Sequence, residues 1–240
     1  MVSNPKTVAV QTPPLQQGDH LTRAEFERRY SAMPQIKKAE LIEGIVQMPS
    51  PVRYQSHGSP HIALAGWVWH YCMNTPGVGG ADNATVRLDL DNEPQPDALI
   101  IREPSHGGRV VIGTDDYLEG APELVAEIAA STVSIDLHTK LRIYRRNQVQ
   151  EYIVWRVEDA AIDWFVLQDG EYVPMTLNAE GVYQSVVFPG LWLDHQAMVT
   201  GDAPRVLRVL QNGLASPEHQ AFVDVLRKAA EELKKRDQAT

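Results

Sequence analysis

Apolar residues recur along the chain at two different spacings, and each spacing predicts a type of element. Over residues 55–73 and 217–235 they follow a helical period. Over residues 85–90 apolar and polar residues alternate, as in a strand with one buried face. A continuous apolar run at 98–101 is typical of a strand buried on both faces, and residues 123–129, apolar except for two glutamates, predict another strand. The pattern therefore predicts helices packed on a sheet.

Turn and capping residues mark the ends of several elements. Thr22, followed three residues later by Glu25, fits a capping box, so a short helix is expected to begin there. A strand-like stretch at 39–48 contains Gly44, which indicates a tight hairpin or a bulge. The resulting order is helix, hairpin, helix, three strands, helix and two strands, with one parallel crossover over 123–157. This order predicts an α/β fold, in which helices pack on an α+β mixed sheet.

The chain divides into three parts. Residues 1–19 are polar, contain three prolines and lack periodicity, so we expect a mobile tail. Residues 20–200 hold the predicted strands and are expected to form one α/β domain. Residues 201–240 are expected to form a helical extension with an apolar stripe.

Composition narrows the classes of function. The 240 residues carry 22 Lys and Arg against 31 Asp and Glu, a net charge of −9, which argues against a broad nucleic-acid surface. A single cysteine, Cys72, excludes an intrachain disulfide framework and a Cys-rich metal site. The sequence has no run of 18 apolar residues, so it predicts no membrane helix, and the N-terminus lacks the apolar core of a signal peptide. We therefore expect a cytoplasmic protein without a membrane partner.

Three residues stand out as candidates for chemistry. Asp97 precedes one buried strand, and Glu127 lies late in the next. If these strands are neighbours, the two carboxylates converge and, with a backbone carbonyl, form a site for Mg²⁺ or Mn²⁺. Lys140, on the helix that follows, would orient a metal-bound water. The alternative is that Asp97 caps a turn, Lys140 is solvated and Glu127, which needs a partner when buried, forms a structural ion pair.

A short basic strip follows. Lys140, Arg142, Arg145 and Arg146 fall within seven positions of one predicted helix. Such a strip would contact phosphates in an otherwise acidic protein, or it would form an ordinary solvated helix face.

These residues together resemble a known group of enzymes. Gln95-Pro96-Asp97 before an apolar strand, then Glu127, then Lys140 on a helix, is similar to the PD-(D/E)XK nuclease superfamily. More narrowly the chain resembles the Uma-two family of putative restriction endonucleases, over roughly residues 22–200. Further matching motifs lie at 40–44, at Pro49, Ser50 and His57, and at 120–125, 151–154 and 189–193. One departure is Ala129, which stands where the superfamily has its lysine; in this family the lysine lies on the helix.

The resemblance implies a restriction-endonuclease-like core with flanking helices and an extra C-terminal helix. It also implies a Mg-dependent endonuclease that hydrolyses phosphodiester bonds of DNA. Asp97, Glu127 and the carbonyl of Ile128 would bind the Mg²⁺ or Mn²⁺ ion, and Lys140 would position the attacking water.

Other roles follow from the same resemblance. Glu40 would be a further catalytic carboxylate, with Glu43 as the competing choice. His57, Arg142 and Arg145 would bind the substrate. A homodimer is expected because a twofold pair of sites can cut both strands. The alternative function is a catalytically silent binding or assembly module with the nuclease fold, and a third is hydrolysis of RNA or of a small phosphoester.

Overall fold

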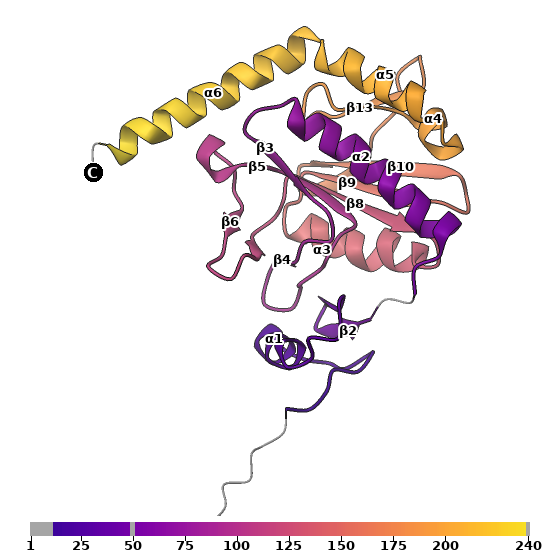
Figure 1. The fold of residues 1–240 in the computed structure, drawn as a ribbon, viewed down its shortest axis with the longest axis vertical. Coiled ribbons are helices and arrows are strands. Elements are labelled where there is room, and N and C mark those ends of the chain that lie inside the picture. The colour runs from indigo at the N-terminus through magenta and orange to yellow at the C-terminus, as the bar shows by residue number, and fades with distance from the viewer. Residues whose placement is uncertain (1–11, 49–50, 239–240) are drawn as a thin grey trace, which may run out of the picture.

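A six-stranded mixed sheet forms the centre of the structure (Figure 1), a computed structural model that describes residues 12–48 and 51–238. Its strands are β3 (Val78–Ala81), β5 (Ala98–Arg102), β8 (Leu124–Ala129), β9 (Glu151–Arg156), β10 (Ala161–Gln168) and β11 (Glu171–Pro174). They lie in the order β11-β10-β9-β8-β5-β3. β8 and β9 are parallel and the other neighbouring pairs are antiparallel, so the predicted mixed sheet and its parallel crossover are confirmed.

Helices cover both faces of this sheet. One π-helical turn, η1 (Tyr54–Gly58), leads into α2 (Ser59–Met73), and another, η3 (Ile135–Lys140), leads into α3 (Leu141–Arg146). Successive strand residues point to opposite faces. Ala98 and Ile100 of β5 belong to the apolar cluster under α2, with Trp67. Leu99 belongs to the cluster under α3, with Ile143. The predicted flanking helices are therefore confirmed.

A helix and a hairpin from the N-terminal part lie beside one end of the sheet (Figure 1). They are α1 (Arg23–Ser31), β1 (Glu40–Ile42) and β2 (Ile45–Gln47). The turn residues Glu43 and Gly44 have φ angles of 51° and 75°, the left-handed pair that a tight two-residue hairpin requires. Leu41 exchanges two backbone hydrogen bonds with Glu93, of 3.2 and 2.8 Å. This exchange fixes the hairpin to the segment that leads into β5.

The segment before α1 packs along the hairpin. The Gly18 N–H donates a 2.9 Å hydrogen bond to the carbonyl of Val46, and Leu15 is only 4% exposed. A buried leucine and a backbone bond thus join residues 12–19, the last part of the expected tail, to the hairpin. Residues 1–11 lie outside the described residues.

The alternating pattern at 85–90 does not form a long strand. It contributes only β4 (Val86–Arg87), which lies in a small sheet of order β4-β7-β6 with β7 (Leu118–Glu119) and β6 (Val111–Ile112). The Asp89 carboxylate accepts hydrogen bonds from the Asp91 N–H and the Asn92 amide, and this local bonding turns the chain. Leu90, predicted on the buried face, is consequently 74% exposed.

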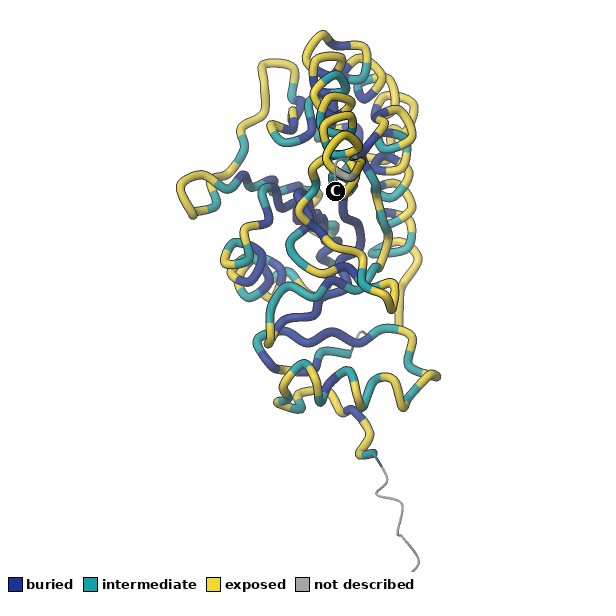
Figure 2. Tube along the Cα trace, turned by 90° about the vertical axis from the view of Figure 1, so that its left-hand side faces the viewer, coloured by how far each residue is buried: buried dark blue, intermediate teal, exposed yellow. Residues whose placement is uncertain are grey.

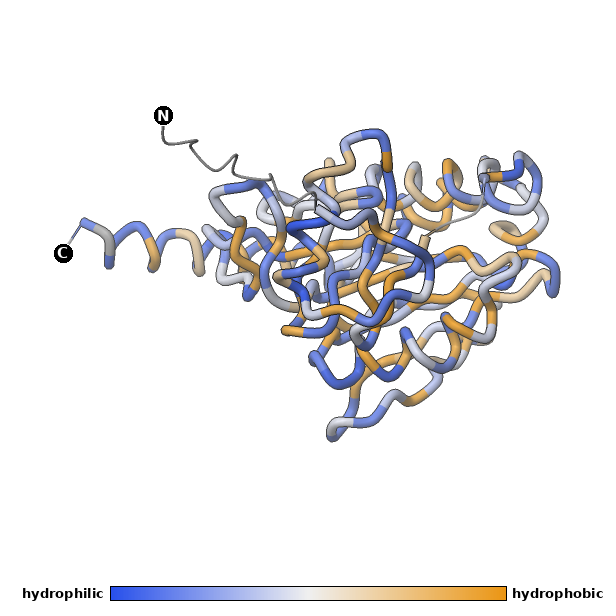
Figure 3. Tube along the Cα trace, turned by 90° about the horizontal axis from the view of Figure 1, so that it is seen from below, coloured by the Kyte–Doolittle hydropathy of each residue, from blue (hydrophilic) through white to orange (hydrophobic). Residues whose placement is uncertain are grey.

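The C-terminal part covers the α2 side of the sheet. It comprises β12 (Val182–Gln184), β13 (Trp192–Asp194), α4 (His195–Thr200), α5 (Ala203–Leu214) and α6 (Pro217–Asp237), which contacts the turn η2 (Pro104–His106). Leu210 of α5 and Leu226 of α6 join the apolar cluster under α2. α6 then extends away from the body and is largely exposed (Figures 2 and 3). None of the helices in the described residues is long and apolar enough to cross a membrane.

We expect the carboxyl group of Glu93 to make the stability of the protein depend on pH. Burial raises the pKa of Glu93 from 4.5 to about 8, and a hydrogen bond with Glu27 adds to the rise, whereas Arg87 and Arg23 oppose it. The folded state then binds more protons than the unfolded state, so the free energy of unfolding should fall as the pH rises from 4.5 through about 8. Glu93→Gln should flatten this part of the profile in urea unfolding, and an unchanged slope would contradict the expectation.

Candidate active site

Two acidic side chains meet where β5 begins and β8 ends. The register pairs Ala98 of β5 with Ala126 of β8, so Asp97, which precedes β5, lies beside the end of β8. Oδ2 of Asp97 accepts a 2.8 Å hydrogen bond from the N–H of Ile128. Glu127 is the neighbouring residue on β8, and both carboxylates are buried. The structure therefore brings the two acids together at one strand end.

The amine of Lys140 returns to this point from the helix that follows β8. Its Nζ lies 2.9 Å from Oε1 of Glu127 and 3.1 Å from Oε1 of Glu40, and Oδ1 of Asp136 is 4.0 Å away. The Tyr144 hydroxyl donates a 2.8 Å hydrogen bond to Oε1 of Glu127. The π-helical turn η3 and the start of α3 thus direct Asp136, Lys140 and Tyr144 toward the sheet, and such turns are frequent at functional sites.

The hairpin delivers Glu40, and not Glu43, to the cluster. Besides the amine of Lys140, Oε1 of Glu40 accepts a 2.7 Å hydrogen bond from the N–H of Gln95. Glu43 lies in the hairpin turn and pairs with Arg142 at 2.9 Å. Of the two competing acids, Glu40 is therefore the one within reach of the candidate lysine.

Negative charge exceeds positive charge inside this cluster. Its buried members among the described residues are the acids Glu40, Asp97, Glu127 and Asp136 and one amine, Lys140. Burial raises the pKa of Glu127 to about 8; the neighbouring acids add to the rise and Lys140 opposes it. Burial alone would lower the pKa of Lys140, but the surrounding carboxylates hold it well above its usual value. The excess of buried acids favours a further cation.

The donor atoms at the strand end suit a hard divalent ion. Both hydrogen bonds that Glu127 accepts from described side chains end on Oε1, which leaves Oε2 for a cation. The carbonyls of Glu123 and Ala129 accept from β9, so alternation along β8 turns the Ile128 carbonyl toward Asp97. Two carboxylates and a carbonyl are oxygen ligands of the kind that Mg²⁺ and Mn²⁺ prefer. Over residues 12–48 and 51–238, no group of three or more His, Cys, Asp and Glu is arranged for a metal ion.

The three side chains expected to bind the substrate separate in the structure. His57 reaches the site, with Nε2 3.5 Å from Oδ1 of Asp97. Arg142 pairs with Glu43, and Arg145 pairs with Glu171 on β11, at the opposite edge of the sheet from β3. The structure does not bring these two arginines to Asp97. Pro49 and Ser50, in the motif that also contains His57, lie outside the described residues.

Two basic residues that the sequence did not single out lie at Asp97. Nζ of Lys38 is 3.4 Å from Oδ1 of Asp97 and 2.7 Å from Oδ1 of Asn83. Nε2 of His61 is 3.1 Å from the backbone carbonyl oxygen of Asp97. The spacing of His57 and His61, four residues apart, is a signal in the sequence for the second histidine. No such periodic signal marks Lys38, which precedes β1 in an irregular segment.

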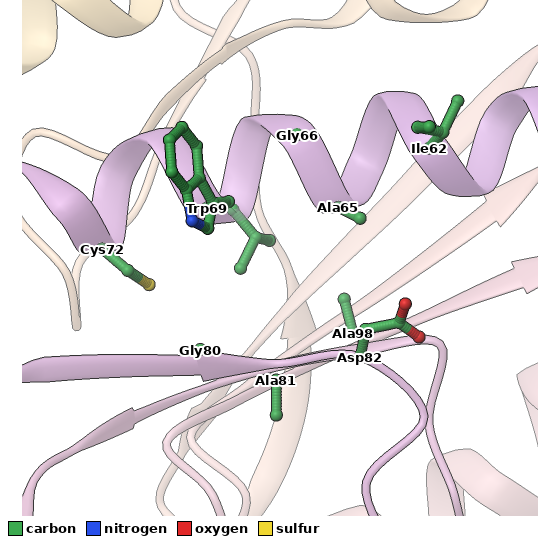
Figure 4. A pocket seen from close by; sticks show the side chains of 10 residues that line it. Ile62, Ala65, Gly66, Trp69, Cys72, Gly80, Ala81, Asp82 and Ala98 are labelled. Carbon is green, nitrogen blue, oxygen red and sulfur yellow. The ribbon is translucent and has the colours of Figure 1, made fainter.

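An apolar groove lies between α2 and β3, beside the site (Figure 4). It encloses about 360 Å³ and is lined along α2 by Ile62, Trp69 and Cys72. Asp82 and Ala98 line it on the sheet side, and Ala98 follows Asp97 in the chain. The groove thus ends next to the acidic cluster but contributes no charged group besides Asp82.

Comparisons with known proteins show the family and the fold of the chain. The model of the Uma2 family, described as "Putative restriction endonuclease", matches residues 23–196. The crystal structure of a putative nuclease belonging to DUF820 from Anabaena variabilis is similar with a TM-score of 0.52 at 12% identity. The similarity covers 72% of this chain and 97% of that chain, and it shows a shared fold. No curated protein matches the chain.

We expect the buried amine of Lys140 to be important for stability. Lys140→Ala should lower the free energy of unfolding by about 3–5 kcal/mol, because it leaves the buried carboxylates without their cation. Arg142→Ala, which removes an exposed ion pair on the adjacent helix, should cost less than about 1 kcal/mol. Urea unfolding of both variants measures the difference, and equal losses would refute the role of the buried pair.

Proposed function

Because the chain belongs to the Uma2 family of putative restriction endonucleases, we propose that it is a metal-dependent endonuclease that hydrolyses phosphodiester bonds of DNA. One observation carries the proposal. Asp97, Glu127 and Lys140 are far apart in the sequence but meet at one strand end, where the amine bonds to the second acid and the first acid bonds to the residue beside it. These are the three side chains to which the resemblance assigns metal binding and the positioning of water.

Asp97, Glu127 and the carbonyl of Ile128 would hold Mg²⁺ or Mn²⁺. Such an ion, when bound, polarises a phosphate oxygen and makes a bound water more acidic. Tyr144 and Lys140 both donate to Oε1 of Glu127, which holds the carboxylate in one orientation. The N–H of Ile128 does the same for Asp97. The two acids are thereby preorganised, so little reorganisation is needed when the substrate binds.

Lys140 would orient the attacking water. A lysine ammonium has three N–H donors, and two of them point to Glu127 and Glu40. The third donor remains for a water molecule. Glu40, fixed by the Gln95 N–H, would accept a hydrogen bond from the amine and keep it in place. The carboxylates also hold the pKa of Lys140 well above its usual value, so the amine would act as a charged donor and not as a base.

Further parts of the proposal concern the setting of the reaction. A homodimer would present two equivalent sites to the two strands of a duplex. The cytoplasm is the expected compartment, because a chain with a single cysteine has no intrachain disulfide to form. At a net charge of −9 the contact with DNA should be narrow and should weaken quickly with salt.

Asp97→Asn tests the metal site. We expect it to abolish Mn²⁺ binding in calorimetry and to lower the rate of Mg²⁺-dependent cleavage of duplex DNA at least about 100-fold, since a neutral amide replaces an anionic ligand. Glu43→Gln is the control, because Glu43 lies in the hairpin turn and pairs with Arg142. It should leave binding and cleavage within about twofold of the unchanged protein.

Two results would overturn the proposal. Wild-type protein that binds no Mn²⁺ and cleaves no duplex would leave the fold as a binding or assembly module. Cleavage of RNA or of a small phosphoester in place of DNA, abolished by the same Asp97→Asn substitution, would keep the metal site and replace the substrate.

A further inference from the structure

Three basic side chains lie at Asp97, whereas Lys140 contacts Glu127 and Glu40. They come from different segments: Lys38 from the chain before β1, His57 from η1 and His61 from α2. Lys38 and His57 approach the same atom, Oδ1 of Asp97, at 3.4 and 3.5 Å, and His61 approaches its carbonyl oxygen at 3.1 Å. The two imidazole rings stack, with centroids 5.7 Å apart and planes at 13°. We call Lys38, His57 and His61 the outer set, and Lys140 with the acids that it contacts the inner set.

The outer set is partly open to solvent, whereas the inner set is closed. The side chains of Lys38, His57 and His61 are 24%, 25% and 19% exposed, but that of Lys140 is 7% exposed and lies between carboxylates. A substrate that approaches from solvent would meet the outer set first. Asn83 accepts one hydrogen bond from Lys38, at 2.7 Å, which orients its amine next to Asp97.

The three arginines of the basic strip, on α3, already form ion pairs away from Asp97. Arg142 pairs with Glu43, Arg145 with Glu171, and Arg146 with Asp89, so each guanidinium already has an anionic partner. The phosphate contacts expected from this strip would have to break those pairs. Lys38 and His57 already pair with Asp97, and His61 pairs with Asp82, but a metal ion at Asp97 would take over that carboxylate and leave the donors of Lys38 and His57 to a phosphate beside it.

The chemistry of the outer set matches a phosphodiester. Ammonium and imidazole N–H groups donate hydrogen bonds to phosphate oxygens, and charge-assisted bonds of this type are among the stronger ones in proteins. Lys38 and His57 face the same carboxylate oxygen of a candidate metal ligand, so a phosphate bound through the metal would be within their reach. His61 is held by Asp82 at 3.3 Å and by Asn83, which keeps its ring beside His57.

We propose that Lys38 and His61 complete, with His57, a subsite that holds the backbone phosphate of the nucleic acid at Asp97. This subsite replaces Arg142 and Arg145 as the phosphate contact. The inference rests on the proposed function for its substrate, but it concerns binding and not cleavage.

Binding of a fluorescent DNA duplex to the full chain with Ca²⁺ in place of Mg²⁺, followed by anisotropy, tests the subsite with a hard cation at the acids but without Mg²⁺-dependent cleavage. Lys38→Gln should lower the affinity about tenfold near 0.1 M salt and reduce the slope of log K against log salt by about 0.9, the loss of one phosphate contact. Lys38→Arg should retain the slope. Lys37→Gln is the matched control: it removes the same charge from the neighbouring residue, which is exposed and donates to the Pro34 carbonyl. It should leave the slope unchanged.

A second pair of variants tests the histidine. His61→Gln should weaken binding of the duplex severalfold. His70→Gln, which changes a histidine about two and a half turns further along the same helix, should leave binding unchanged. Melting temperatures of all variants separate binding from folding: equal affinities with a lowered melting temperature would make Lys38 and His61 structural and overturn the subsite. Equal slopes for Lys38→Gln and Lys37→Gln, or no binding by wild-type protein, would overturn it too.

The outcomes also separate the subsite from the proposed function. Wild-type protein that binds the duplex through Lys38 but never cleaves it with Mg²⁺ would refute the endonuclease and support the subsite. Cleavage that depends on Asp97, together with binding that is indifferent to Lys38, would refute the subsite and support the endonuclease.

Discussion

The ion pair between Lys140 and Glu127 is the interaction on which the candidate site depends. The buried carboxylate of Glu127, near the end of an apolar strand, loses its hydration, and a bonded cation and hydroxyl compensate for that loss. The helix after β8 must therefore return its amine to the sheet, and the hairpin must supply Glu40 on the other side of that amine. The Nζ atom of Lys140 thereby joins η3 to both β8 and β1 through hydrogen bonds.

Much of this arrangement could be predicted from local sequence. The apolar stretches at 98–101 and 124–129 indicate buried strands, and Glu127 within the second indicates a partner for that acid. The convergence of Asp97 and Glu127 depends on the two strands being neighbours, which the structure shows. The return of Lys140 from a helix could not be derived this way, because the direction of its side chain depends on the π-helical turn and on packing.

The structure differs from the sequence pattern where a distant partner, or a local bond between side chain and backbone, decides the environment of a residue. Four basic residues on one short helix look like a phosphate-binding strip until Glu43, Glu171 and Asp89 are found beside three of them. The alternation at 85–90 looked like a strand because a single carboxylate that turns the backbone leaves no periodic trace. Lys38 was missed for the same reason: an irregular segment has no pattern from which its neighbours can be inferred.

The hairpin also has a consequence for how this fold can vary. The segment from Lys38 through the hairpin brings Lys38 to Asp97 and Glu40 to Lys140. It lies outside the six-stranded sheet and is joined to the segment before β5 by the Leu41–Glu93 hydrogen bonds. Lys38 and Glu40 therefore belong to a different part of the fold from the sheet that carries Glu127. A related chain could keep the sheet, Asp97 and Glu127 intact and change its substrate by remodelling one hairpin.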